Sequence, residues 1–331
     1  MSSLKEVKNR IASVRNTLKI TSAMKMVAAA KLHHAQQAIL GMRPYEQMLH
    51  SILSDLTKAS SGASSNPLSG REGNVPESIG GDALSSNPST SPSEEGGAKP
   101  RVAVVVFSSN NSLCGSFNAN VTGHFSSVIA SLKAEGLTAA DVDVYTVGRK
   151  GADAARRMGF TPKADYSTLA DHPDYQGTLA LSGLLMDEFE NERVSKVILV
   201  YNHYASNSRQ PSVSETYLPW QTDALSSSSG IPTAVEPSSS GASREAETAP
   251  FIVEPSADEV LAELRPKVLR LKLYTVLLDA SAAEHAARTV AMQIASDNAQ
   301  KLLDELTLEY NKSRQQKITS EILDLVGGLQ R

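Results

Sequence analysis

The chain has 331 residues, a formal net charge of −4, and 40% apolar but only 5% aromatic residues. This balance indicates no partner class by overall charge, and we expect no nucleic-acid partner. The single cysteine, Cys114, excludes an intrachain disulfide. No apolar run approaches the roughly 20 residues that cross a bilayer, so we expect a soluble protein whose membrane contact is made only through partners.

Residues 1–58 are predicted to form the first helix of a coiled coil. Ser3 and Glu6 indicate a capping box at its start, and Pro44 predicts a bend near its end. Residues 1–31 carry seven basic side chains against one acidic one, which indicates either an acidic partner surface or a solvated basic face. Apolar or small residues recur at alternating steps of three and four, as in a heptad seam, at Leu4, Val7, Ile11, Val14, Leu18, Thr21, Ala28, Leu32, Ala35, Ile39 and Met42.

Two segments of the chain are rich in Ser, Gly and Pro, namely residues 59–99 and 222–255. Such compositions bury too little apolar surface to offset the entropy lost on ordering. We expect a disordered insertion at 59–99 and a Ser-rich insertion or linker at 222–255. Neither is predicted to carry catalytic residues.

Residues 100–221 are predicted to form an α/β domain. Apolar runs predict strands at 101–107, 142–147, 196–201 and 215–218, and amphipathic stretches predict helices at 118–134, 150–158 and 178–192. Strands that alternate with helices favour a largely parallel, Rossmann-like sheet with helices on its faces.

Residues 256–331 are predicted to form the second long helix. Ser256 and Glu259 indicate its cap, and Pro266 predicts a kink in its first turns. A helix of this size is a rod on the order of 105 Å long, which needs support along its length. Its tail continues a heptad pattern at Ile318, Ile322, Leu325 and Leu329. We therefore expect an antiparallel coiled coil between the two chain ends, with the α/β domain at one end of the rod.

No catalytic, cofactor-binding or metal-binding site is predicted. The chain has neither a G-x-x-x-x-G-K-S/T loop nor a G-x-G-x-x-G motif after a strand. Residues 108–118 follow the first predicted strand and form either a tight turn or a ligand loop with few glycines. Cys114 has no predicted base, and His33 and His34 are adjacent, which is a poor spacing for two metal ligands on a helix.

Several motifs, in the same order, resemble the gamma subunit of F-type ATP synthases. Residues 4–32 read LKEVKNRIASVRNTLKITSAMKMVAAAKL, residues 283–292 read AEHAARTVAM, and residues 308–328 read LEYNKSRQQKITSEILDLVGG. Shorter landmarks are ASDNA at 295–299, LCGSFN at 113–118, GRKG at 148–151, YN at 201–202 and LP at 218–219. The sequence departs from the family before LCGSFN, where residues 110–112 read NNS instead of a charged, glycine-containing triplet.

The resemblance implies a rotating central stalk that has no active site of its own. In the family, one gamma subunit turns inside a ring of three alpha and three beta subunits and docks, with an epsilon subunit, on the c-subunit ring. It couples proton flow to ATP synthesis or hydrolysis and regulates the ATPase activity. The implied location is peripheral, on the cytoplasmic side of a bacterial inner membrane, and no cofactor is implied.

The resemblance also implies that Met24, Arg288, Gln315, Thr319 and Glu321 couple the rotor to the ring. The apolar tail predicts a bearing that turns in an apolar sleeve, formed by Ile322, Leu325, Val326 and Leu329. Each of these tail residues is equally well interpreted as an ordinary coiled-coil seam position. Two other functions stay open from the sequence: a nucleotide-dependent α/β enzyme with coiled-coil arms, and a coiled-coil scaffold protein.

Overall fold

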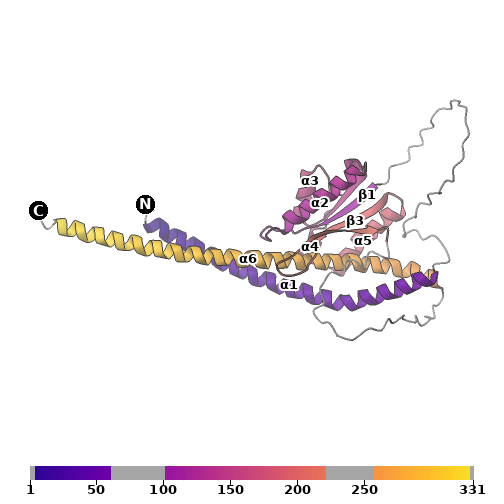
Figure 1. Cartoon of the computed structure of the whole chain (residues 1–331), viewed down its shortest axis with the longest axis horizontal. Coiled ribbons are helices and arrows are strands. Elements are labelled where there is room, and N and C mark those ends of the chain that lie inside the picture. The colour runs from indigo at the N-terminus through magenta and orange to yellow at the C-terminus, as the bar shows by residue number, and fades with distance from the viewer. Residues whose placement is uncertain (1–3, 61–100, 221–255, 329–331) are drawn as a thin grey trace, which may run out of the picture.

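The computed structural model describes residues 4–60, 101–220 and 256–328. Two long helices, α1 (Leu4–Ser60) and α6 (Ala257–Gly328), lie antiparallel and form a rod (Figure 1). Pro44 and Pro266 both lie inside these helices and end neither of them. The predicted insertions fall almost entirely outside the described residues.

The predicted seam of α1 packs against small residues of α6. Leu32 and Ala35 of α1 form a buried cluster with Ala282 and Ala286, which are fully buried. Because alanine has a short side chain, the two helix backbones can approach closely at this level. The antiparallel coiled coil predicted from the periodicity is therefore confirmed along this part of the rod.

The tail of α6 runs past the beginning of α1 (Figure 1). Thr21 contacts Ser296, and the antiparallel register that follows places Leu4 opposite about Ser313. Beyond this level the tail has no α1 partner, so the apolar side chains of Ile318, Ile322 and Leu325 are 44%, 54% and 70% exposed. The expectation that the tail seam pairs with α1 is wrong, because α6 is longer than α1 and the register leaves its excess at this end.

A four-stranded sheet forms the centre of the α/β domain. Its strands β1 (Arg101–Phe107), β2 (Val142–Val147), β3 (Val194–Asn202) and β4 (Ser212–Leu218) lie in the order β2-β1-β3-β4. The first three are parallel, and β4 is antiparallel to β3. The loop of residues 203–211 is too short for a parallel crossover, so β4 returns as a hairpin. The Rossmann-like sheet is thus confirmed, with one antiparallel edge strand.

Helices cover both faces of the sheet. They are α2 (Phe117–Ala134), the 3₁₀ turn η1 (Ala139–Asp141), α3 (Arg149–Arg157), the short and unpredicted α4 (Ser167–Asp171) and α5 (Tyr175–Glu190). On one face Val104 and Val106 pack with Phe125 of α2. On the other face Phe107 and Leu199 pack with helices α5 and α6. The C-terminal helix is therefore both half of the rod and a covering layer of the sheet.

Polar contacts also join the sheet to α6. The Tyr217 hydroxyl donates to the carbonyl oxygen of Leu269 at 3.0 Å, and Lys272 Nζ lies 2.9 Å from Glu215 Oε1. Both contacts are largely shielded from water, so they fix how β4 sits on α6. None of the helices in the described ranges combines the length and hydropathy needed to cross a membrane.

Candidate functional site

Open α/β sheets bind ligands at the carboxyl ends of their parallel strands. Here two side chains of this chain occupy that place. The Ser108 hydroxyl accepts a hydrogen bond from the Gly151 amide at 2.7 Å, and Asn110 Oδ1 accepts one from the Arg149 amide at 3.0 Å. These amides belong to the first turn of α3, whose amino end would otherwise attract a phosphate.

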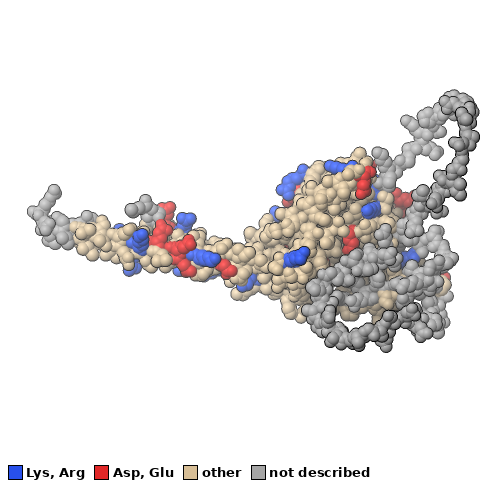
Figure 2. Space-filling model, in the orientation of Figure 1, with Lys and Arg blue, Asp and Glu red and all other residues tan. Residues whose placement is uncertain are grey.

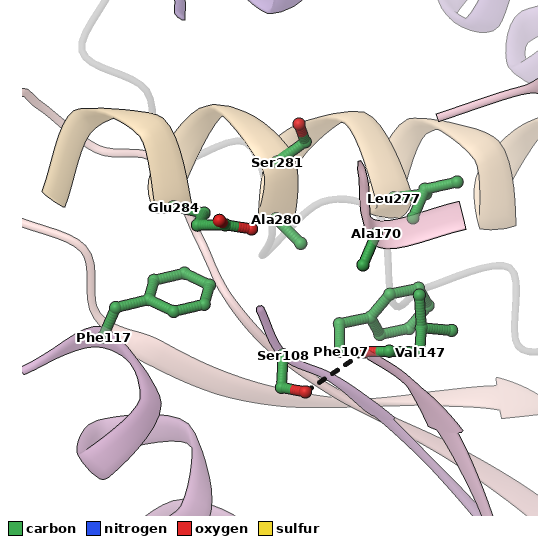
Figure 3. Close-up of a pocket in the computed structure, with 9 residues that line it drawn as sticks. All are labelled: Phe107, Ser108, Phe117, Val147, Ala170, Leu277, Ala280, Ser281 and Glu284. Carbon is green, nitrogen blue, oxygen red and sulfur yellow. Dashed lines mark hydrogen bonds between the residues drawn. The ribbon is translucent and has the colours of Figure 1, made fainter. Parts of the chain in front are cut away.

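The backbone around this edge is closely packed. A Cβ on Gly151 would lie 2.7 Å from Ser108 Oγ, and Gly148, with φ of +103°, abuts the Ser108 carbonyl. The adjoining cavity has a volume of about 10 Å³, which is room for about one water molecule. Figure 3 shows Glu284 of α6 facing Phe117 across it. The edge is therefore filled by the protein itself and has no space for a nucleotide.

The loop of residues 108–118 is a tight turn packed on α6. The Ser109 amide donates to Asn118 Oδ1 at 3.2 Å across the loop. Cys114 is buried and packs with Phe117 and with Ala283 of α6. Of the two interpretations left open by the sequence, the structure supports the turn.

Metal-binding side chains do not cluster in the described ranges, where no three His, Cys, Asp or Glu residues are placed to share an ion. His33 and His34 lie exposed on α1. They have no third potential ligand beside them in the described part of the chain.

The residues that the resemblance implicates in coupling are spread along the rod. Met24 lies on α1 with 41% of its surface exposed. Gln315, Thr319 and Glu321 are exposed on the unpaired tail of α6. Two polar contacts lie within the tail: the Thr319 hydroxyl donates to the Gln315 carbonyl at 2.9 Å, and Glu321 lies 3.7 Å from Lys317. The structure therefore leaves these four side chains facing outward.

Arg288 differs from the other four, because it turns inward. Its side chain is only 17% exposed, and Nη2 lies 2.7 Å from Glu284 Oε1. The same guanidinium donates to the Asn111 carbonyl at 3.4 Å. Arg288 thus links α6 to the loop of residues 108–118.

Glu284 and His285 belong to the same junction, and sequence reasoning missed both. Burial raises the pKa of Glu284, while the positive charge of Arg288 acts in the opposite direction. Burial, together with Arg288 and Lys31, lowers the pKa of His285 to about 4. The available signal was two ionisable residues within an alanine-rich stretch of a helix, which indicates a face with a close neighbour.

The visible face of the rod carries both signs of charge. Figure 2 shows Lys and Arg side chains alternating with Asp and Glu side chains along the rod. Charged side chains of both signs therefore lie next to one another on this face of the rod (Figure 2). This arrangement is compatible with both interpretations of the basic first helix, an acidic partner surface and a solvated basic face.

The geometry defines a class of protein: a stalk made of two helices from opposite chain ends, which carries an α/β domain whose ligand-binding edge is filled by its own side chains. The family model described as ATP synthase matches residues 3–330. The ATP synthase gamma chain of Phocaeicola vulgatus is 47% identical, and that of Bacteroides fragilis 42%, each over 99% of both chains. The chain belongs to the family of ATP synthase gamma chains.

Solved structures show the same fold. A chain of the Euglena gracilis mitochondrial ATP synthase rotor aligns with a TM-score of 0.54 at 16% identity, covering 95% of this chain and 98% of that one. A chain of the Tetrahymena thermophila mitochondrial ATP synthase central stalk and c-ring structure aligns with a TM-score of 0.52 at 18% identity, covering 84% and 99%. The resemblance seen in the sequence is confirmed.

Proposed function

We propose that this chain is the rotating central stalk of an F-type ATP synthase and couples proton flow through the membrane sector to ATP synthesis and hydrolysis. The observation that carries the proposal is the rod. Its two helices come from opposite ends of the chain, and one of them also covers the sheet of the α/β domain. Torque applied to the domain can therefore pass directly into the rod.

The proposed partners are those of a central stalk. One copy enters a ring of three alpha and three beta subunits with its free tail, and the α/β domain docks with an epsilon subunit on the c-subunit ring. The tail of α6 that extends beyond α1 supports this orientation, because it is the narrowest part of the molecule (Figure 1). The proposed location is peripheral, on the cytoplasmic side of the bacterial inner membrane.

The stalk itself is proposed to be non-catalytic. Support comes from the sheet edge, where Ser108 and Asn110 occupy the amides that would hold a phosphate. An asymmetric rod needs no chemistry of its own, because each orientation stabilises a different state in each neighbouring beta subunit. Regulation of the ATPase would act through the same contacts.

The coupling contacts are proposed at Met24, Gln315, Thr319 and Glu321, which face outward. Arg288 would act differently, by holding the loop of residues 108–118 against the rod. The bearing is proposed at Ile322 and Leu325, whose exposed apolar side chains suit a sleeve that resists displacement without selecting one angle. Val326 and Leu329 extend this bearing on the basis of the sequence pattern, since the side chain of Val326 and all of Leu329 lie outside the described residues.

Reconstitution tests the function. The chain is co-expressed with its alpha and beta subunits, and we expect one copy per three alpha–beta pairs, with ATP-driven rotation of a probe on the α/β domain. Equal coupling of ATP hydrolysis to proton pumping in complexes that lack the chain, or no rotation of the probe in complexes that contain it, would contradict the proposal. A stable homodimer of the chain that excludes alpha and beta would instead support a scaffold protein, and nucleotide binding to the full chain would support an enzyme.

A further inference from the structure

The loop between β3 and β4, residues 203–211, lies where the α/β domain meets both helices of the rod. The loop is braced internally. The His203 amide donates to the Pro211 carbonyl at 2.8 Å, and the Ser206 amide donates to the Arg209 carbonyl at 3.1 Å. The Gln210 side chain donates to the carbonyls of Ser206 and Asn207 at 2.9 and 2.8 Å. A loop with this many internal bonds can transmit force.

The loop is attached to α6 at two points on one carboxylate. Asp279 Oδ2 lies 2.7 Å from His203 Nδ1, and Asp279 Oδ1 accepts from the Tyr204 amide at 3.0 Å. Both Asp279 and His203 are largely buried. Two bonds to the two oxygens of one carboxylate fix an orientation as well as a distance, and a charged acceptor strengthens them.

The same loop reaches α1 through the next side chain. Gln36 Nε2 donates to the Tyr204 hydroxyl oxygen at 2.8 Å, and that hydroxyl donates to Asn207 Oδ1 at 2.7 Å. The Tyr204 ring packs against the cluster of Leu32 and Ala282 that joins the two helices. Tyr204 therefore touches α1, α6 and its own domain.

Apart from the polar contacts of Tyr217, Lys272 and Arg288 described above, the domain meets the rod through apolar side chains. Leu273 and Leu277 of α6 pack on the sheet in an apolar layer. Apolar burial is non-directional. This layer therefore resists separation of the domain from the rod but only weakly opposes rotation of the domain about the rod. Hydrogen bonds depend on angle. The bonds of Asp279 and Gln36 attach one loop to both helices of the rod, so they can oppose rotation of the domain about the rod axis.

We propose that the β3–β4 loop is a torsional clamp, in which Asp279 and Gln36 hold Tyr204 and so set the angle of the α/β domain on the two-helix rod. The inference rests on the proposed function, because a fixed angle matters most in a part that carries torque. The clamp residues are positioning residues. They would determine how stiffly rotation of the domain is passed to the rod.

The test reports the orientation of the α/β domain relative to the rod in the full-length chain, in the absence of the alpha and beta subunits. Spin labels are attached to cysteines introduced at two exposed positions, Arg156 on α3 and Ala30 on α1. Cys114 is buried and should stay unlabelled. The distance distribution between the labels is then recorded by pulsed electron paramagnetic resonance for wild type, Gln36→Leu, Tyr204→Phe and the double variant.

Loss of the bond should enlarge the population with a displaced domain about fivefold, which corresponds to the net contribution of one hydrogen bond. The double variant should be no broader than Tyr204→Phe alone, because Tyr204→Phe already removes the bond from Gln36 together with the bond to Asn207. The matched control is Gln37→Leu, at the neighbouring exposed glutamine, which should leave the distribution unchanged. Unchanged distributions in both clamp variants, or equal broadening by the control, would overturn the clamp.

A second measurement separates the clamp from the proposed function. In the assembled complex, Gln36→Leu and Tyr204→Phe should widen the angular fluctuation of a probe on the α/β domain while ATP hydrolysis continues. A wild-type chain that assembles with no ring would count against the proposed function, whereas the spin-label result would still decide the clamp.

Discussion

Thr21 of α1 and Ser296 of α6 share a hydrogen bond of 2.8 Å between their hydroxyl oxygens, across 275 positions of sequence. Thr21 also donates to the Leu18 carbonyl of its own helix at 3.1 Å. The Ser296 hydroxyl therefore finds a fixed acceptor on the opposite helix. This bond marks the register of the rod, and that register leaves the last turns of α6 unpaired.

We expect Ser296→Ala to lower the free energy of unfolding by about 1 kcal/mol, since it removes a partly buried hydrogen bond between the helices. Urea unfolding of the full-length chain measures the change. Thr17→Val is the control, because the Thr17 hydroxyl is exposed and bonds only to the Ser13 carbonyl of its own helix. An equal loss of unfolding free energy in the control would mean that the effect comes from the change in helix propensity and not from the bond between the two helices.

Enlarging the small side chains of the rod should be more damaging. Ala286 is fully buried against the cluster of Leu32 and Ala35, so Ala286→Leu should cost about 1–3 kcal/mol by forcing the helices apart. The same urea experiment measures it. Ala29→Leu, at an exposed position of α1, adds the same volume and should have little effect. Tolerance of Ala286→Leu would mean that the helices are not in close contact there.

His285 predicts a dependence of stability on pH. Burial, with Arg288 and Lys31, lowers its folded-state pKa from 6.5 to about 4. The folded chain then binds fewer protons than the unfolded chain between these values. Stability should fall as the pH drops below 6.5, by up to about 3 kcal/mol once the pH is below the folded-state pKa.

The variant His285→Gln should lose this part of the pH dependence, as measured by urea midpoints across the same range. His34→Gln, at an exposed histidine of α1, is the matched control and should keep it. His203 contributes with the opposite sign, because its bond to Asp279 raises its pKa. That contribution is present at low pH and is lost as the pH rises through the raised value. A His285 variant with the full wild-type pH dependence would refute the prediction.

Met24→Lys should reduce coupling in the assembled enzyme. The side chain is 41% exposed on α1, so a lysine there would place a new charge against the ring at certain angles. We expect fewer protons pumped per ATP, with hydrolysis retained. Met26→Lys adds the same charge at a more exposed methionine on a different side of the helix. An equal loss in both variants, or none in Met24→Lys, would remove the specific role of Met24.

The amino-acid sequence by itself determined the two long helices and the order of strands and helices between them. These features depend on local periodicity, which a short window of sequence contains. The predicted strand at 142–147 matches β2 residue for residue, and the cap at Ser256 is present, with its hydroxyl accepting from the Glu259 amide at 3.3 Å. The motif runs on the two helices were also sufficient to identify the family.

Tertiary structure alone decided which surfaces meet. The closed sheet edge depends on Asn110 reaching α3, and the clamp depends on Gln36 reaching Tyr204, a separation of 168 positions. The inward turn of Arg288 and the exposure of Ile322 follow from the register of the rod. A periodic pattern is nearly unchanged when one helix slides along another by a heptad, so it specifies a seam but not its partner positions. Contacts between distant residues select one register. That register determines which residues of the two helices face the α/β domain.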